Sequence, residues 1–227
     1  MSWLSEVRKR QPGRPLWRIA VWQFMQKLAK LILVVLYRAK HFGSQNIPLE
    51  GPVLYLANHQ SFYDPILLGL GSDKRHFFSL GRSTLYDKRW SAFMGNITNS
   101  IPVEQGAGDV KAMKKCIEVL KDNQALMLFP EGARTLDGEV AEFETGAMLI
   151  IKRAKPQVVP VAVEGPYDVW PRGQKRPKLS GRMGIMYGPP IDAELLTAMP
   201  AKDAMAMLRQ KVVNMRAELA QKIARRG

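Results

Sequence analysis

Short apolar runs alternate with amphipathic segments along most of the chain. The runs are rich in β-branched and other apolar side chains and are bounded by turn residues, as buried strands are; they cover residues 53–57, 77–80, 125–129, 158–163 and 183–187. Apolar side chains recur at helical spacing in residues 109–122, 143–153 and 201–225. This alternation predicts an α/β fold in which helices cover a mostly parallel sheet.

A longer helical pattern occupies residues 15–40, and Pro15 suits its first position. One side of this helix is polar and the other is apolar, with Gln23, Gln26, Lys27 and Lys30 opposed to Trp17, Phe24, Leu28 and Leu31. Residues 31–37 are apolar all round, but this run is far shorter than the roughly 20 residues that span a bilayer. The pattern predicts a helix in the membrane interface, and it fits a helix packed on the protein's own core equally well. We therefore expect a basic amphipathic membrane-interface segment, residues 1–40, followed by a main domain, residues 41–227.

Positive charge is concentrated at the two ends of the chain. The formal net charge of the 227 residues is +14; residues 1–40 hold nine Lys/Arg and one Glu (+8), and residues 201–227 hold seven Lys/Arg and two acids (+5). An anionic membrane surface or a nucleic acid would attract such ends. No nucleic-acid-binding motif is visible, and aromatic residues do not interleave with the basic ones. We therefore expect an anionic membrane surface as the partner, and no nucleic acid.

The cysteine and histidine content limits the chemistry. Cys116 is the only cysteine, so the chain can form no internal disulfide, and an intracellular setting is favoured. The histidines at positions 41, 59 and 76 are too far apart for zinc-site spacing. No metal site is expected.

A cluster of polar side chains follows the first buried run. Five polar residues fall within residues 58–64, directly before Pro65, which begins the next helix. Open α/β sheets bind ligands beyond the carboxyl ends of their strands. His59 could take up a proton near neutral pH, and the carboxylate of Asp64 could orient it, provided that the chain turns between them. Asp64 is also well placed to be the N-cap of the helix that follows, and we expect it to fill both roles.

A second polar turn follows the apolar run 125–129. Pro130 and Gly132 bend the chain, with Glu131 between them and Arg134 two residues further on. Arginine holds phosphate through two parallel hydrogen bonds. Alone, this sequence fits a surface turn with a local Glu–Arg pair. Together with His59 and Asp64 it indicates a site that combines a base with an anion-binding group.

These residues resemble the sequence blocks of the glycerolipid acyltransferase family. The first block is Asn58-His59-x-x-x-x-Asp64 and the third is Phe129-Pro130-Glu131-Gly132-x-Arg134. Two further blocks agree in order and spacing, namely residues 101–103 and residues 158–165. The resemblance covers about residues 40–190 and implies that residues 41–227 form an acyltransferase domain.

The resemblance implies an activity and roles for particular residues. The reaction would move a fatty acyl group from acyl-CoA or acyl carrier protein to the hydroxyl of a lysolipid, above all 1-acylglycerol-3-phosphate, giving phosphatidic acid. His59 would be the general base and Asp64 its orienting partner, while Glu131, Gly132 and Arg134 would bind the acceptor. The thioester is a co-substrate, and no cofactor is implied. The protein would be peripheral or monotopic on the cytoplasmic face of the membrane.

The chain departs from the family pattern at positions that bear on the acceptor. Glu104-Gln105 stands where Asp-Arg is frequent, so an arginine expected to hold the acceptor phosphate is lost; Arg82 could compensate. Ala133 and Glu144 replace residues that are commonly Thr and basic, respectively. These changes leave open an acceptor other than 1-acylglycerol-3-phosphate, such as a lyso-aminolipid or another lysophospholipid.

Two other classes of function remain open. A lipid hydrolase would use Ser61 or Ser83 as nucleophile, but the Gly-x-Ser-x-Gly elbow is absent and Ser61 is close to His59 along the chain. A non-catalytic protein could bind anionic membranes through the basic ends alone.

Overall fold

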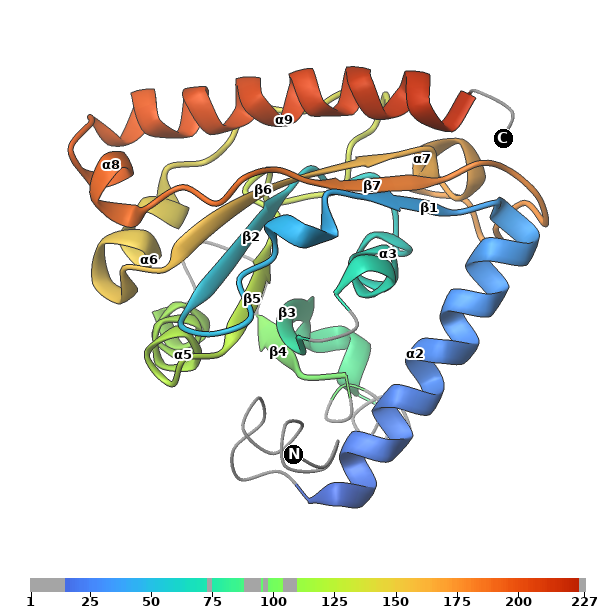
Figure 1. Ribbon diagram of the computed structural model, residues 1–227, viewed down its shortest axis with the longest axis horizontal. Helices are drawn as coiled ribbons and strands as arrows, with labels where there is room; N and C mark the ends of the chain where they lie inside the picture. The colour runs from blue at the N-terminus through green and yellow to red at the C-terminus, as the bar shows by residue number, and fades with distance from the viewer. Residues whose placement is uncertain (1–14, 73–74, 88–94, 96–97, 104–109, 225–227) are drawn as a thin grey trace.

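A seven-stranded sheet forms the centre of the protein in the computed structural model (Figure 1), which describes residues 15–72, 75–87, 95, 98–103 and 110–224. The strand order is β1-β7-β6-β2-β5-β3-β4, and the only antiparallel neighbours in it are β6 and β7. The strands are β1 (Lys40–Phe42), β2 (Val53–Ala57), β3 (Phe77–Arg82), β4 (Ser100–Val103), β5 (Ala125–Leu128), β6 (Gln157–Glu164) and β7 (Gly184–Tyr187).

Helices cover both faces of this sheet. One face carries α5 (Val110–Lys121), α6 (Gly146–Ala154), α8 (Ala193–Thr197) and the long α9 (Ala201–Ala224). The other face carries α2 (Leu16–Tyr37) and α3 (Asp64–Gly71). In Figure 1, α5 and α6 therefore lie on one side of the strands and α2 on the other. The remaining short pieces are α7 (Pro166–Val169) and the 3-10 turns at Ser44–Asn46 and Ser83–Tyr86.

The central strand β2 shows how the side chains divide between the two layers. Leu54 and Leu56 belong to the apolar cluster under α5, α6 and α9, whereas Val53, Tyr55 and Ala57 belong to the cluster under α2 and α3. Successive side chains of a strand point to opposite faces, so a strand covered on both sides must be apolar throughout. All five residues are buried, as the continuous apolar run predicts.

The predicted α/β architecture is confirmed, and most predicted elements are present within a few residues. The predicted helix 143–153 begins only at Gly146, because the backbone N–H of Glu144 donates to the carbonyl of Pro130 and holds that segment against the preceding turn. The strands β1 and β4 were not predicted; each is short and lies at an edge of the sheet.

Helix α2 turns Gln26 and Lys30 to the protein, whereas Lys27 and most of its apolar side face the surroundings. Gln26 Nε2 donates to the carbonyl of Gly69 at 2.9 Å, and Lys30 Nζ donates to that of Leu70 at 3.2 Å. These carbonyls lie in the last turn of α3, where carbonyl groups have no N–H donor within the helix and need donors from outside it. Only a few side chains of α2, among them Leu33 and Tyr37, enter the core.

The outward side of α2 is large and apolar. Its exposed side chains are Leu16, Trp17, Phe24, Leu28, Leu31, Ile32, Val34, Val35 and Leu36. The whole 22-residue helix, rather than residues 31–37 alone, is long and apolar enough to cross a membrane by length and composition. Only 17% of its most apolar stretch is buried inside the protein. The sequence analysis, which counted only residues 31–37, therefore underestimated the length of the apolar part of this helix. An exposed apolar surface of this kind marks an interaction with lipid or protein.

We predict that polar substitutions on this outward side weaken binding to lipid vesicles. Phe24 and Val35 are 67% and 66% exposed, so Phe24→Gln with Val35→Gln should leave folding intact. Each substitution removes about 1.5–3 kcal/mol of apolar transfer free energy, and together they should lower the vesicle partition coefficient at least about tenfold. Leu195→Gln, on α8, is the matched control because Leu195 is 64% exposed on the other side of the sheet. Equal partitioning of the two variants in a flotation assay would contradict the prediction.

Candidate active site

His59 and Asp64 form a close pair beyond the carboxyl end of β2. The Nδ1 atom of His59 lies 2.7 Å from Oδ2 of Asp64. Residues 61–63 make the turn that the pair requires, and the backbone N–H of Asp64 donates back to the carbonyl of Ser61. The His59 side chain is 19% exposed, whereas that of Asp64 is fully buried. Because Nδ1 is occupied by the carboxylate, Nε2 is the ring nitrogen left for an external group.

Asp64 binds the loop before it and does not cap its own helix. Its Oδ2 accepts hydrogen bonds from the backbone N–H groups of Gln60 (2.6 Å) and Ser61 (2.8 Å) as well as from His59. The N-cap position of α3 is Tyr63, and no side chain caps the helix. The predicted N-cap role is therefore wrong: Asp64 is the first helical residue, and its carboxylate turns back to the residues that precede the helix. Its Oδ1 is buried and has no hydrogen-bond partner in the described part of the chain.

The ring of His59 is held from a second side by Phe129. The two rings stack with centroids 3.8 Å apart and planes 12° from parallel. Phe129 follows β5, the neighbour of β2 in the sheet, so the two turns meet because their strands are adjacent. The backbone N–H of Thr135 donates to the carbonyl of His59 at 2.8 Å and joins the turns further.

Glu131 connects the second turn to the first. Its Oε1 accepts from the backbone N–H of His59 at 2.7 Å, and its Oε2 accepts from that of Ala141 at 3.1 Å. Burial raises the pKa of Glu131 to about 7, although these two hydrogen bonds favour the ionised form. Both carboxylate oxygens are thus engaged within the protein, and the expected role of Glu131 in acceptor binding stays a prediction.

Gly132 completes the bend after Glu131. Its φ of +71° is a backbone conformation that side chains disfavour, and a Cβ here would lie 3.0 Å from a carboxylate oxygen of Glu144. The turn therefore needs glycine for conformational reasons alone, and its expected part in acceptor binding stays a prediction.

Arg134, from the second turn, is under the electrostatic influence of Asp64 and of two other arginines. The guanidinium carbon of Arg134 lies 3.8 Å from the ring centroid of Phe62, a cation–π contact. The pKa of Arg134 is lowered by partial burial and by the positive charges of Arg172 and Arg82. Arg82 thus acts electrostatically on Arg134, and so does Arg172 from the exposed loop after α7, to which the sequence analysis gave no role. The expected part of Arg82 and Arg134 in acceptor binding stays a prediction. Glu104 and Gln105 lie outside the described residues.

An aromatic cluster adjoins the arginines. Trp170 contacts Phe62 and Tyr63, with ring centroids 5.2 and 5.4 Å away, and Tyr63 contacts Tyr37 at 5.4 Å. Tyr37 is the last residue of α2, so this cluster connects the apolar helix to the His59–Asp64 pair. The sequence alone does not reveal this cluster, because Tyr37, Phe62 and Trp170 are distant from one another along the chain.

Asn58 was quoted in the first sequence block but given no role. Its side chain bridges β2 and β6, donating to the carbonyl of Val163 at 2.9 Å and accepting from the backbone N–H of Val163 at 2.8 Å. It thereby satisfies two buried backbone groups where the strands separate.

The position of Ser61 argues against the lipid hydrolase that the sequence left open. Ser61 is fully buried and its hydroxyl donates to the carbonyl of Trp170 at 2.9 Å, so it is poorly placed to act as a nucleophile.

Within the described residues, no group of three or more His, Cys, Asp or Glu side chains is arranged to hold a metal ion.

Comparison with known proteins places the chain among acyltransferases. The sequence model of the Acyltransferase family matches residues 38–164. The chain is 28% identical over 173 residues to the chloroplast 1-acyl-sn-glycerol-3-phosphate acyltransferase of Arabidopsis thaliana, covering 74% of this chain and 48% of that protein. It is 24% identical over 203 residues to the 1-acyl-sn-glycerol-3-phosphate acyltransferase of Bacillus subtilis, covering 89% and 98%, respectively. The chain spans about half the length of the Arabidopsis relative and of a Brassica napus one, and nearly all of the Bacillus one.

A solved structure shares the fold. The crystal structure of the 1-acyl-sn-glycerophosphate acyltransferase of Thermotoga maritima aligns with a TM-score of 0.73 and 22% identity, over 98% of this chain and 88% of that one. The matched family region spans more than half of the chain and contains the His59–Asp64 pair and the Glu131–Arg134 turn. This chain therefore belongs to the acyltransferase family.

Proposed function

We propose that the protein transfers a fatty acyl group from acyl-CoA or acyl carrier protein to the hydroxyl of 1-acylglycerol-3-phosphate, forming phosphatidic acid. The observation that carries this proposal is the 2.7 Å His59–Asp64 pair, together with Arg134, on which the charges of Asp64, Arg82 and Arg172 act. The pair supplies a base, and the arginines suit the acceptor's phosphate. The names of the Arabidopsis and Bacillus relatives support the same acceptor.

The contacts support a direct acyl transfer. The Nε2 atom of His59 takes the proton of the acceptor hydroxyl while the hydroxyl oxygen attacks the thioester carbonyl. The carbon–sulfur bond then breaks, and the departing thiolate receives the proton from the imidazolium. Asp64 stabilises the imidazolium and keeps the ring oriented. The thioester is already activated, so no enzyme nucleophile is needed.

The surface around the pair supports a lipid acceptor at a membrane. The aromatic cluster of Phe62, Tyr63 and Trp170 borders Arg134, so apolar and phosphate-binding groups are adjacent. The apolar side of α2 and the basic residues 1–40 favour attachment to an anionic, cytoplasmic membrane surface, with the protein peripheral or monotopic. The acceptor could then enter the site directly from the lipid layer.

We predict that His59 and Asp64 act as one unit. His59→Ala and Asp64→Asn should each lower kcat by about 10²–10⁴-fold, and the double variant should be little worse than either one. Acyl transfer from labelled palmitoyl-CoA to 1-acylglycerol-3-phosphate is the measurement. His41→Ala, an exposed histidine variant, should keep the original rate. Near-normal turnover by His59→Ala would refute the base assignment.

We predict that the arginines act on the acceptor and not on the acyl donor. Arg134→Ala should raise the acceptor KM by about 10–100-fold, and Arg172→Ala should raise it by a smaller factor, with the donor KM unchanged. Arg176→Ala changes an exposed arginine of the same loop and should have no effect. A rise in the donor KM alone would remove the phosphate role from Arg134.

A screen of acceptors tests the choice of lysolipid. Mass-spectrometric detection of products from 1-acylglycerol-3-phosphate, a lysophospholipid with an esterified phosphate and a lyso-aminolipid would rank them directly. The proposal requires that the phosphate monoester give the highest kcat/KM.

We predict that Glu131 makes the stability of the fold depend on pH. The folded-state pKa is raised from 4.5 to about 7, so the stabilisation is fully present below the unfolded value and is lost as the pH rises through about 7. Between about pH 5 and 8, the free energy of unfolding should fall by about 1–3 kcal/mol more in the native protein than in Glu131→Gln, after a discount for solvent screening. Urea unfolding at both pH values measures the difference. Parallel pH dependence in the two proteins would contradict it.

A further inference from the structure

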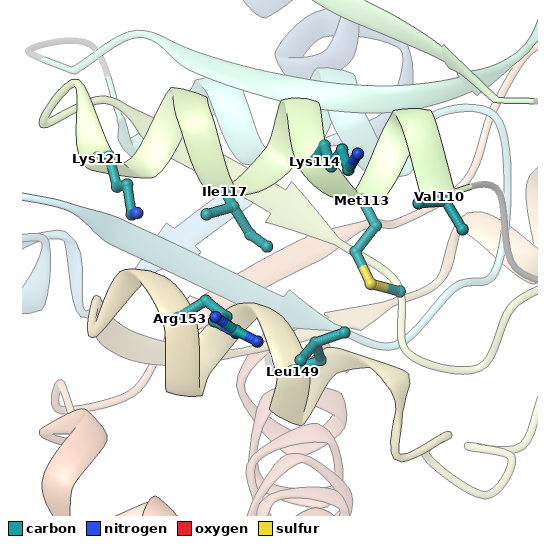
Figure 2. A pocket seen from close by; sticks show the side chains of 7 residues that line it. All are labelled: Val110, Met113, Lys114, Ile117, Lys121, Leu149 and Arg153. Atoms are coloured by element: carbon teal, nitrogen blue, oxygen red, sulfur yellow. The ribbon is translucent and has the colours of Figure 1, made fainter.

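A groove of about 370 Å³ lies between α5 and α6 (Figure 2). Its apolar lining consists of Val110, Met113 and Ile117 from α5 and Leu149 from α6. In Figure 2, Met113 and Ile117 point toward α6, and Leu149 points toward α5. Val110 and Leu149 are exposed and Met113 and Ile117 are half-buried, and such an apolar lining of an open groove favours an apolar partner.

The cations of this groove are arranged around its apolar lining. Lys114, Lys121 and Arg153 also line the groove, and within the described residues none of them forms an ion pair. The one acidic residue of α5 and α6 is Glu118, which pairs with Lys115 at 3.1 Å. An apolar lining bordered by unpaired positive charges is complementary to a ligand whose apolar face is bordered by acidic groups.

The groove begins at the same edge of the sheet as the active site. Helix α5 ends shortly before β5 begins, and α6 ends shortly before β6, so both helices start at the edge where the parallel strands end. Val110 and Leu149 mark this end of the groove, and Lys121 and Arg153 mark the other (Figure 2). A partner lying along the groove would have one end at the edge that carries His59.

The groove is on the opposite side of the sheet from α2. Helices α5 and α6 pack on the apolar cluster that contains Leu54 and Leu56, whereas α2 packs on the cluster that contains Val53 and Tyr55. If the exposed side of α2 sits in lipid, the groove is turned away from it. A soluble partner fits this position better than a second lipid contact.

We propose that the α5–α6 groove docks an acidic amphipathic helix of the acyl carrier protein that delivers the acyl group. The apolar positions i, i+3, i+4 and i+7 of such a helix would fill the groove, and its acidic side chains would meet Lys114, Lys121 and Arg153. The groove runs along α5, whose 12 residues span about 18 Å, enough for a helix of similar length. The proposal rests on the proposed acyl transfer and selects the carrier protein, rather than CoA, as the donor that this surface recognises.

Binding and turnover test the proposal separately. The groove variant is Lys114→Glu with Lys121→Glu; the control is Lys202→Glu with Lys211→Glu, which changes the net charge equally on α9. The Kd for palmitoyl-loaded acyl carrier protein should rise at least about tenfold in the groove variant and stay unchanged in the control, and the native affinity should fall with added salt. Leu149→Gln, at a side chain that is 44% exposed, should also weaken binding without unfolding the protein.

Kinetics then separate the groove from the catalytic site. In the groove variant, the KM for the palmitoyl carrier protein should rise by a similar factor while the KM for palmitoyl-CoA stays unchanged. Equal Kd values for the carrier protein in the native protein and the groove variant would overturn the proposal. It would also be overturned if the native protein used palmitoyl-CoA but not the palmitoyl carrier protein as donor. Reduced binding of the groove variant to anionic vesicles, with an unchanged Kd for the carrier protein, would assign the surface to lipid instead. The native protein could also bind the carrier protein in a charge-dependent way and yet transfer no acyl group from either donor. That result would refute the proposed activity but would leave the docking surface supported.

Discussion

The buried carboxylate of Asp64 is the contact on which the candidate site depends. One of its oxygens accepts from the ring of His59 and from two backbone N–H groups of the loop that follows β2. A fully buried charge is costly unless donors surround it, and these three donors come from consecutive residues. The loop therefore takes the conformation that presents all three, and this conformation sets the direction of the His59 ring. Phe129 and Glu131 from the adjacent turn hold the same residue by stacking and by a backbone hydrogen bond.

The sheet gives the protein two sides with different surfaces. On one side, α2 turns Gln26 and Lys30 inward to the carbonyls at the end of α3, which leaves most of its apolar side outward. Its last residue, Tyr37, contacts the aromatic cluster at the site. On the other side, α5 and α6 form the apolar groove with basic side chains. Both sides meet the edge where β2 and β5 end, so a lipid acceptor and a carrier-bound donor could approach His59 from different directions.

The positive charge near Arg134 comes from distant parts of the chain. Glu104-Gln105 removes an arginine expected from the family resemblance. Arg82 and Arg172, which lie 90 positions apart in the sequence, both act on the pKa of Arg134. Positive charge around Arg134 depends on proximity in the fold, and it does not require the arginines to share a motif.

The sequence alone determined the alternation of strands and helices, because continuous apolar runs and helical spacing reflect burial on both faces of the sheet. It also predicted the His59–Asp64 pairing on the condition that the chain turns between them, and the structure supplies that turn at residues 61–63. Only the tertiary structure decided which side of α2 faces outward, because the carbonyls that bind Gln26 and Lys30 lie more than 35 residues away. It also decided that Asp64 turns away from its own helix, that Phe129 stacks on His59, and that the charge of Arg172 acts on Arg134. These contacts depend on which strands are neighbours in the sheet, and strand order is set by the packing of the whole chain rather than by any local pattern.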